Sequence, residues 1–200
     1  MNRPTLIVML KEPRPGRVKT RLARDIGKTA AANWFRHQSQ ALLRNLSQDP
    51  RWNIVASVSP DPAIHSRVWP PTLSRIPQGS GDLGERMRRA LVQCSPGPTV
   101  LIGGDIPGVS KSHINRAFTL LKRRDVVLGP ATDGGFWLIG VKGAKPLPTA
   151  LFQNVRWSSK HTLQDTMKSI GTGHSIGLTD TLSDVDTLQD LLDQKKLDHI

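Results

Sequence analysis

Chemistry-bearing side chains gather in a basic segment near the N-terminus. Between Lys11 and Arg21, five of eleven residues are basic and only Glu12 is acidic. The segment follows a short apolar run and precedes an expected helix, whose first N–H groups are unpaired and carry a positive dipole end. This combination is typical of phosphate binding, although a charge run of this kind can also be solvated surface. We predict that the ligand-binding residues here are Lys11, Arg14, Gly16, Lys19 and Arg21.

Two segments resemble known glycine-rich motifs, but neither meets all the requirements of its motif. The Lys19-Thr20 pair resembles the end of the nucleoside triphosphatase loop, but the required glycines would fall at Glu12 and Val18. Residues 79–84 match the dinucleotide fingerprint letter for letter, yet they follow a polar lead-in and place the carboxylate of Asp82 where a pyrophosphate would lie. Neither motif is therefore assigned its usual function.

Asp105 has the setting of a metal ligand. It follows the apolar run 100–102 and lies among glycines that allow a ligand to approach closely. Mg²⁺ is commonly held by one or two carboxylates and completed by phosphate oxygens and water. Asp105 and the basic segment could therefore hold the same phosphates from two sides. The alternative is that Asp105 only caps the turn before Pro107.

Two further acidic positions follow later apolar segments. Asp133 lies in the glycine-containing stretch 129–135, after an expected buried strand. Near the C-terminus, the stretch 184–190 contains several acids, of which Asp184 or Asp186 could bind a metal ion. Asp186 or Thr187 could equally cap the last helix.

Apolar runs and helical periodicity alternate along the chain and predict one α/β domain over residues 1–200. Expected strands lie at 5–10, 53–58, 99–102, 125–128, 136–139 and 175–178, and expected helices lie at 19–46 (broken near Gly27), 84–93, 112–122, 158–170 and from 187 onward. This order predicts a mostly parallel sheet with helices on both faces and ligands beyond the carboxyl ends of the strands. Trp34 is expected to pack in the core.

The composition describes a folded, strongly basic chain. Its formal net charge is +12, with 37% hydrophobic and 22% charged residues. A nucleic-acid-binding protein with a basic face at Arg86, Arg88 and Arg89 is one alternative, although no zinc-finger or RNA-recognition motif supports it. No apolar segment is long enough for a membrane span, and the single cysteine, Cys94, is consistent with a reducing compartment. A cytoplasmic location is expected.

Five segments together resemble a family. They are Lys11-x-Pro-x-Pro-Gly-x-Val-Lys-Thr-Arg-Leu22, Gln78-Gly-x-Gly-Asp-Leu-Gly-Glu-Arg-Met87, Gly104-Asp-x-Pro107, Gly129-Pro-Ala-Thr-Asp-Gly-Gly135 and Asp184-Val-Asp-Thr187. With them the chain resembles the uncharacterised glycosyltransferase-like proteins (DUF2064 type) of the nucleotide-diphospho-sugar transferase superfamily, which are related to nucleotidyltransferases of cofactor biosynthesis.

The resemblance implies a three-layer α/β/α sandwich of the GT-A type, which is Rossmann-like. It implies that the first loop holds nucleotide phosphates, that Asp105 and Asp186 share a Mg²⁺ or Mn²⁺ ion, and that Asp133 faces the acceptor. Residues of the second segment would lie near the base or ribose, namely Gln78, Gly79, Gly81 and Asp82. The chain departs from the family pattern at Phe136, where Tyr is expected, and at Lys160, where Thr is expected.

We therefore expect a Mg²⁺- or Mn²⁺-dependent transferase with a nucleotide-sugar or nucleoside triphosphate donor and an unknown acceptor. Its expected catalytic residues are Lys19, Asp105 and Asp133. Glycosyl and nucleotidyl transfer remain open, because both use the same phosphate-binding groups. The alternatives are a basic nucleic-acid-binding protein and a family member that binds a nucleotide without turnover.

Overall fold

A computed structural model describes residues 3–94 and 96–197 of the chain. Its strands are β1 (Thr5–Lys11), β2 (Asn53–Ser59), β3 (Ser74–Pro77), β4 (Thr99–Gly103), β5 (Val126–Pro130), β6 (Phe136–Val141) and β7 (Ile176–Leu178). Its helices are α1 (Leu22–Ile26), α2 (Lys28–Ser47), the 3₁₀ helix η1 (Asp61–His65), α3 (Leu83–Gln93), α4 (Lys111–Leu121), α5 (Thr162–Ile170) and α6 (Leu188–Leu197). None of these helices is long and apolar enough to cross a membrane.

The strands form one mixed sheet in the order β3-β2-β1-β4-β6-β5-β7. Every neighbouring pair is parallel except the two pairs made by β6, which runs antiparallel to β4 and to β5. The prediction of a mostly parallel α/β sheet is thereby confirmed. Since β6 is reversed, its first residue lies at the edge of the sheet where β4 and β5 end.

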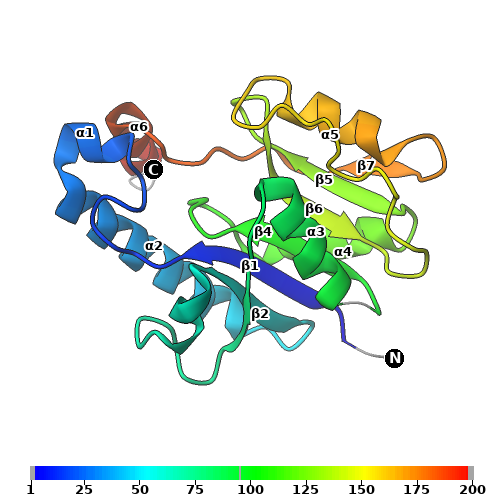
Figure 1. Ribbon diagram of the computed structural model, residues 1–200, viewed down its shortest axis with the longest axis horizontal. Helices are drawn as coiled ribbons and strands as arrows, with labels where there is room; N and C mark the ends of the chain where they lie inside the picture. Colours follow the sequence, from blue (N-terminus) through cyan, green and yellow to red (C-terminus); the bar gives the residue numbers. More distant parts are fainter. Residues whose placement is uncertain (1–2, 95, 198–200) are drawn as a thin grey trace.

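The alternating side chains of β1 show why the sheet needs helices on both faces. Leu6, Val8 and Leu10 join the core on the face covered by α2 and α4, while Ile7 joins the core on the opposite face with α3 and α5. These side chains are 0 to 1% exposed, so each face of the sheet must be covered to remove apolar surface from water. The result is the predicted three-layer sandwich (Figure 1).

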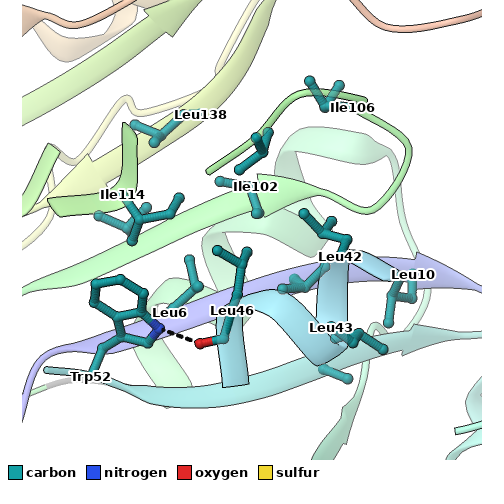
Figure 2. Packing of buried hydrophobic residues seen from close by; sticks show 14 of the residues in the cluster. Leu6, Leu10, Leu42, Leu43, Leu46, Trp52, Ile102, Ile106, Ile114 and Leu138 are labelled. Carbon is teal, nitrogen blue, oxygen red and sulfur yellow. Dashed lines mark hydrogen bonds between the residues drawn. The ribbon is translucent and has the colours of Figure 1, made fainter. Parts of the chain in front are cut away.

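Figure 2 shows the packing of the first of these two cores. Leu42 and Leu46 of α2 pack with residues of β1 and β4, and the Trp52 indole lies beside them. Because the indole N–H is buried, it needs a partner, and it donates to the carbonyl oxygen of Leu46 at 3.1 Å. This bond ties the end of α2 to the start of β2 and helps to fix where the chain enters the sheet.

Local signals explain most element boundaries. Gly27, with φ of 86°, separates α1 from α2 and accounts for the predicted break. Asp82 and Glu85 form a reciprocal capping box at the start of α3. Ser110 and His113 do the same for α4.

Two predictions about elements were wrong. The helix expected from residue 158 begins at Thr162, because Ser158 has a φ of 54° and the following residues form turns. Strand β3 was missed, because Ser74-Arg-Ile-Pro77 is short, lies at the sheet edge and carries no apolar alternation.

Candidate active site

A cleft of about 670 Å³ lies at the carboxyl edge of the sheet. Its walls come from the loop after β1, the start of α3, the end of β4, the turn between β5 and β6, the segment before α5 and the segment before α6. Figure 1 shows α1 and α6 side by side at this end of the molecule, although they are far apart in the sequence. The predicted location beyond the strand ends thus coincides with the cleft.

Lys19 occupies the centre of the charged part of the cleft. Its side chain is only 4% exposed, and its Nζ lies 2.7 Å from Asp105 Oδ2 and 2.9 Å from Asp186 Oδ1. Burial lowers the pKa of Lys19, but the charges of the two aspartates outweigh burial and hold the pKa above its ordinary value. Lys19 is therefore a buried ammonium ion between two carboxylates.

The loop that carries Lys19 is held in an unusual backbone conformation. Lys19 has a φ of 45°, in the left-handed region that non-glycine residues seldom adopt, and Gly16 makes the preceding turn with a φ of 74°. Val18 anchors the loop because its side chain is buried against Ala32 and Phe35 of α2. A strained position that is supported by packing is common at functional sites.

Trp34 of α2 also lies near the ammonium of Lys19. Its ring centroid is 5.9 Å from Lys19 Nζ, within the range of a cation–π contact. The residue is partly buried and packs against the small apolar group at Val18 and Phe35. The prediction that Trp34 belongs to the core is therefore only half correct, since the ring also faces the charged site.

Asp105 and Asp186 are both directed at the lysine and are not used as caps. Asp105 pairs with Lys19, and in the described part of the chain no backbone N–H of the turn before Pro107 donates to its carboxylate. At the start of α6, capping is done by the pair Thr187 and Asp190, whose hydroxyl and carboxylate bond each other. The carboxylate of Asp186 remains free to pair with Lys19.

Asp184 is the acid that the sequence left open as an alternative to Asp186 for binding a metal ion. It lines the cleft and is partly buried, and its pKa is raised to about 6, first by burial and then by the charge of Asp186. Between the two acids, Val185 is 3% exposed and packs inward. The signal in the sequence was this alternation, because residues two apart on an extended segment point to the same side.

The basic residues near Lys19 divide into two groups. Lys11, Arg17 and Arg21 line the cleft, and Arg21 Nη1 lies 3.1 Å from Asp186 Oδ2. Arg14 pairs with Glu12 at 2.5 Å, and its side chain is 68% exposed. The structure thus brings Arg17, which was not among the predicted ligands, to the cleft and directs Arg14 elsewhere.

The loop predicted to lie near the base or ribose is tied down by internal bonds. Gln78 Nε2 donates to the carbonyl oxygens of Leu10 and Ser57 at 3.1 and 2.9 Å. The N–H of Gly79 donates to Asp61, and Asp82 caps α3. Of the four residues predicted in this loop, Gln78 lines the cleft, whereas Gly79, Gly81 and Asp82 lie outside its described lining.

Three arginines of α3 are engaged within the molecule. Arg86 donates to the carbonyl oxygen of Gly81, Arg89 to that of Ser80, and Arg88 to that of Pro148. These side chains hold the loops on either side of α3. The basic face suggested for nucleic acid is therefore used to fix the protein's own backbone.

Asp133 lies at the tip of the turn between β5 and β6 and lines the cleft. Its Oδ1 accepts the N–H of Gly135 at 2.8 Å. Next to it the wall becomes aromatic, since Phe136 stacks with Phe152 and contacts Trp157, with ring centroids 6.4 Å apart in both pairs. The cleft thus has a charged part around Lys19 and an apolar part around Phe136.

Among the described residues, no group of three or more His, Cys, Asp or Glu side chains is arranged as a complete metal site. Asp105 and Asp186 nevertheless converge on one cation, the ammonium of Lys19. Two carboxylates are a donor set that fits Mg²⁺ or Mn²⁺ when phosphate oxygens and water complete the coordination. The residues therefore fit an ion that arrives with phosphate ligands.

The fold is that of nucleotide-diphospho-sugar transferase structures. A proposed transferase of this kind from Desulfovibrio desulfuricans G20 is 27% identical, with a TM-score of 0.87 over 99% of this chain and 88% of that one. Residues 42–159 match the family described as "uncharacterized protein conserved in bacteria" (DUF2064), and the chain belongs to this family. A search of curated protein sequences finds no match.

More distant structures share the fold. The 4-diphosphocytidyl-2C-methyl-D-erythritol synthase of Anaerococcus prevotii DSM 20548 is 9% identical, with a TM-score of 0.62 over 100% of this chain and 99% of that one. A Mycobacterium tuberculosis H37Rv protein in complex with manganese is 15% identical, with a TM-score of 0.56 over the whole of both chains. At these identities the likeness concerns the fold alone.

Proposed function

We propose that the protein is a Mg²⁺- or Mn²⁺-dependent transferase that uses a nucleotide-sugar or a nucleoside triphosphate as donor. The observation that carries this proposal is the convergence of Asp105 and Asp186 on a single cation beside the basic loop. The two carboxylates come from segments that follow different strands and meet only in the fold. The name of the D. desulfuricans relative and the manganese bound to the M. tuberculosis protein agree with it.

In this proposal the charged part of the cleft binds the donor phosphates. Lys11, Arg17 and Arg21 line one wall and would neutralise phosphate oxygens, together with Lys19. Asp105 and Asp186 would hold the divalent ion, which supplies further neutralisation of charge on the phosphates. The preorganised cations thus favour a transition state in which negative charge moves onto the leaving phosphate.

The acceptor would lie on the side of Asp133. This carboxylate lines the same cleft as Lys19 and the aromatic wall of Phe136 and Trp157. It could orient the acceptor's nucleophilic oxygen by accepting its hydrogen bond, while the aromatic rings contact the acceptor's body. Attack at phosphorus would release pyrophosphate, and attack at a sugar carbon would release a nucleoside diphosphate.

A thermal-shift panel on the parent and on Asp105→Asn tests the proposal. Nucleoside triphosphates and nucleotide-sugars are each combined with Mg²⁺, Mn²⁺ or a chelator. A donor present at about 100 times its Kd stabilises the parent by ~2.7 kcal/mol, which corresponds to roughly 5 to 10 °C for a chain of this length. We expect this shift to require the divalent ion and to be lost in Asp105→Asn.

Asp25→Asn is the matched control, because it removes one exposed acid from α1 and lies outside the described lining of the cleft. It should keep the full shift. If Asp105→Asn also keeps a metal-dependent shift, the assignment of the ion site is wrong. Assays for pyrophosphate and nucleoside diphosphate release then separate the two transfer reactions, and binding without either product would indicate a non-catalytic member.

A further inference from the structure

The ammonium of Lys19 occupies the place where the two aspartates converge. It contacts an oxygen of each carboxylate at 2.7 and 2.9 Å, and the side chain is 4% exposed. Arg21 holds the second oxygen of Asp186. A divalent ion held by these two carboxylates would need the same oxygen atoms as ligands. The ammonium and the ion therefore compete for the same acceptor atoms and repel each other.

We propose that Lys19 is a resident cation that closes the ion site to free divalent metal and that donor phosphates open it by drawing the ammonium away. This inference rests on the proposed function, because it concerns the same two carboxylates. Its consequence is an order of binding in which the divalent ion enters with the phosphates. An isolated ion in solution meets a site that already holds a positive charge.

The position of Lys19 is consistent with a movable ammonium on a fixed backbone. Its backbone is set by the left-handed φ of 45° and by the buried anchor Val18. The side chain, in contrast, has four flexible carbons. Its neighbours along the cleft wall, Arg17 and Arg21, are exposed cations that would assemble around the same phosphates. A rotation of the side chain can therefore exchange one anionic partner for another without unfolding the loop.

A simple structural ion pair would have a different consequence. If the contact of Lys19 with the aspartates only stabilised the fold, removing the ammonium would weaken the protein and would not improve metal binding. If Lys19 only bound donor phosphates, its removal would weaken donor binding alone. The proposed role predicts two changes of opposite sign, a gain for the free ion and a loss for phosphate ligands.

Binding of Mn²⁺ alone, followed by the electron paramagnetic resonance of the free ion, tests the proposal in the parent and in Lys19→Met. If the ammonium occupies the site at least nine-tenths of the time, the competent fraction is at most one-tenth, and its removal raises the apparent Mn²⁺ affinity about tenfold or more. The same variant should bind Mn²⁺ with inorganic pyrophosphate more weakly than the parent, after subtraction of protein-free samples. Lys19→Gln provides a polar alternative if the Met variant does not fold.

Arg21→Met is the matched control. It removes a positive charge that pairs with the same Asp186, but from an exposed side chain that does not contact Asp105. Its gain in Mn²⁺ affinity should be small, because only occupancy between the two carboxylates blocks the ion. Equal gains in both variants, or no gain in either Lys19 variant, would overturn the proposal.

The failure of this inference can be told from that of the proposed function. If the parent shows the metal-dependent donor shift but the Lys19 variants bind Mn²⁺ no better than the parent, the proposed function is supported. The proposal that Lys19 closes the ion site is then wrong. If the variants bind Mn²⁺ more tightly but the parent shows no donor shift, the role of Lys19 at the ion site is supported and the transferase assignment is wrong.

Discussion

Two clusters of aspartate and basic side chains in this fold have opposite character. In the first, near α5, Asp165 accepts three hydrogen bonds from Arg156, through the backbone N–H, Nε and Nη2 at 3.2, 2.7 and 2.9 Å. These side-chain bonds lower the pKa of Asp165 to about 2 despite its burial. The first cluster is thus fully satisfied within the chain.

The second cluster, in the cleft, is less completely paired within the chain. Lys19 is shared by two carboxylates, and a third acid, Asp184, lies beside them with a pKa raised to about 6. Buried polar groups in proteins are normally paired, and groups left imperfectly satisfied tend to mark functional sites. The comparison teaches that the completeness of pairing differs between a structural carboxylate and the cleft carboxylates that would bind a ligand in the proposed function, although both are the same residue type.

The largest expected effect comes from breaking the satisfied cluster. Asp165→Ala removes the three hydrogen bonds that Arg156 donates to the carboxylate and should lower the free energy of unfolding by more than Asp82→Ala does. Urea unfolding of the parent and the variant measures it. Because the folded-state pKa is depressed, the contribution is present above about pH 4 and is lost as the pH falls toward 2. A loss that stays the same at pH 2.5 and at pH 7 would contradict this origin.

A smaller effect on stability, of opposite sign, is expected in the cleft cluster. Because the pKa of Asp184 is about 6 in the folded protein and 3.8 without its surroundings, its contribution becomes unfavourable as the pH rises from about 4 to 6. A pKa difference of about two units corresponds to at most ~3 kcal/mol in the free energy of unfolding. Because Asp184 is partly exposed, we expect about 1.5 kcal/mol. Asp184→Asn should therefore be more stable than the parent at pH 7.5 in chelator.

Urea unfolding at pH 7.5 and at pH 4 distinguishes this origin from a simple packing effect. The gain from Asp184→Asn should shrink at pH 4, because the carboxyl group is then largely protonated in the folded parent. An equal gain at the two pH values would mean that charge is not its cause. In that case Asp184 would belong with the structural carboxylates.

The smallest effect concerns Asp82, a carboxylate with a structural role as a helix cap that was also expected at the ligand site. Its carboxylate caps α3, so Asp82→Ala should lower stability by about 1 kcal/mol, while Asp82→Asn keeps the cap. Thermal unfolding measures both variants. The sequence also predicted that Asp82 binds nucleotide. An Asn variant that is as stable as the parent but binds the donor more weakly would sharpen the comparison by showing a carboxylate with both roles.

Most of the fold could be predicted because its strands are buried on both faces. The runs at β1, β4 and β5 are continuously apolar, and helical periodicity between them implied a mostly parallel sheet. The reversal of β6 could not be seen, because a strand flanked by two antiparallel neighbours has the same apolar composition as a parallel one. β3 was missed since edge pairing needs no apolar pattern.

Local sequence could indicate which residues reach the cleft, whereas contacts between distant parts of the chain could not be predicted. Asp105 stood out among glycines, and the basic segment marked Lys19. That Lys19 lies between Asp105 and Asp186 could not be predicted, because the contact with Asp186 joins residues 167 positions apart. Arg14 was expected in the site by its charge, yet a neighbouring acid holds it.

The reversal of β6 has a consequence for how such a domain can diversify. β5 and β6 form a hairpin whose tip, residues 131–135, reaches the cleft between two strands of the central sheet. A hairpin tip can lengthen or change its sequence without altering the register of the strands below it, because their ladder bonds are formed independently of the turn. The loop after β1, in contrast, carries the buried side chains of Lys19 and Val18, which contact other elements. Under the proposed function, a new acceptor could be accommodated by changes at the cleft-facing positions of this tip, such as Asp133, while Gly134, which lies against the backbone of Lys160, is retained.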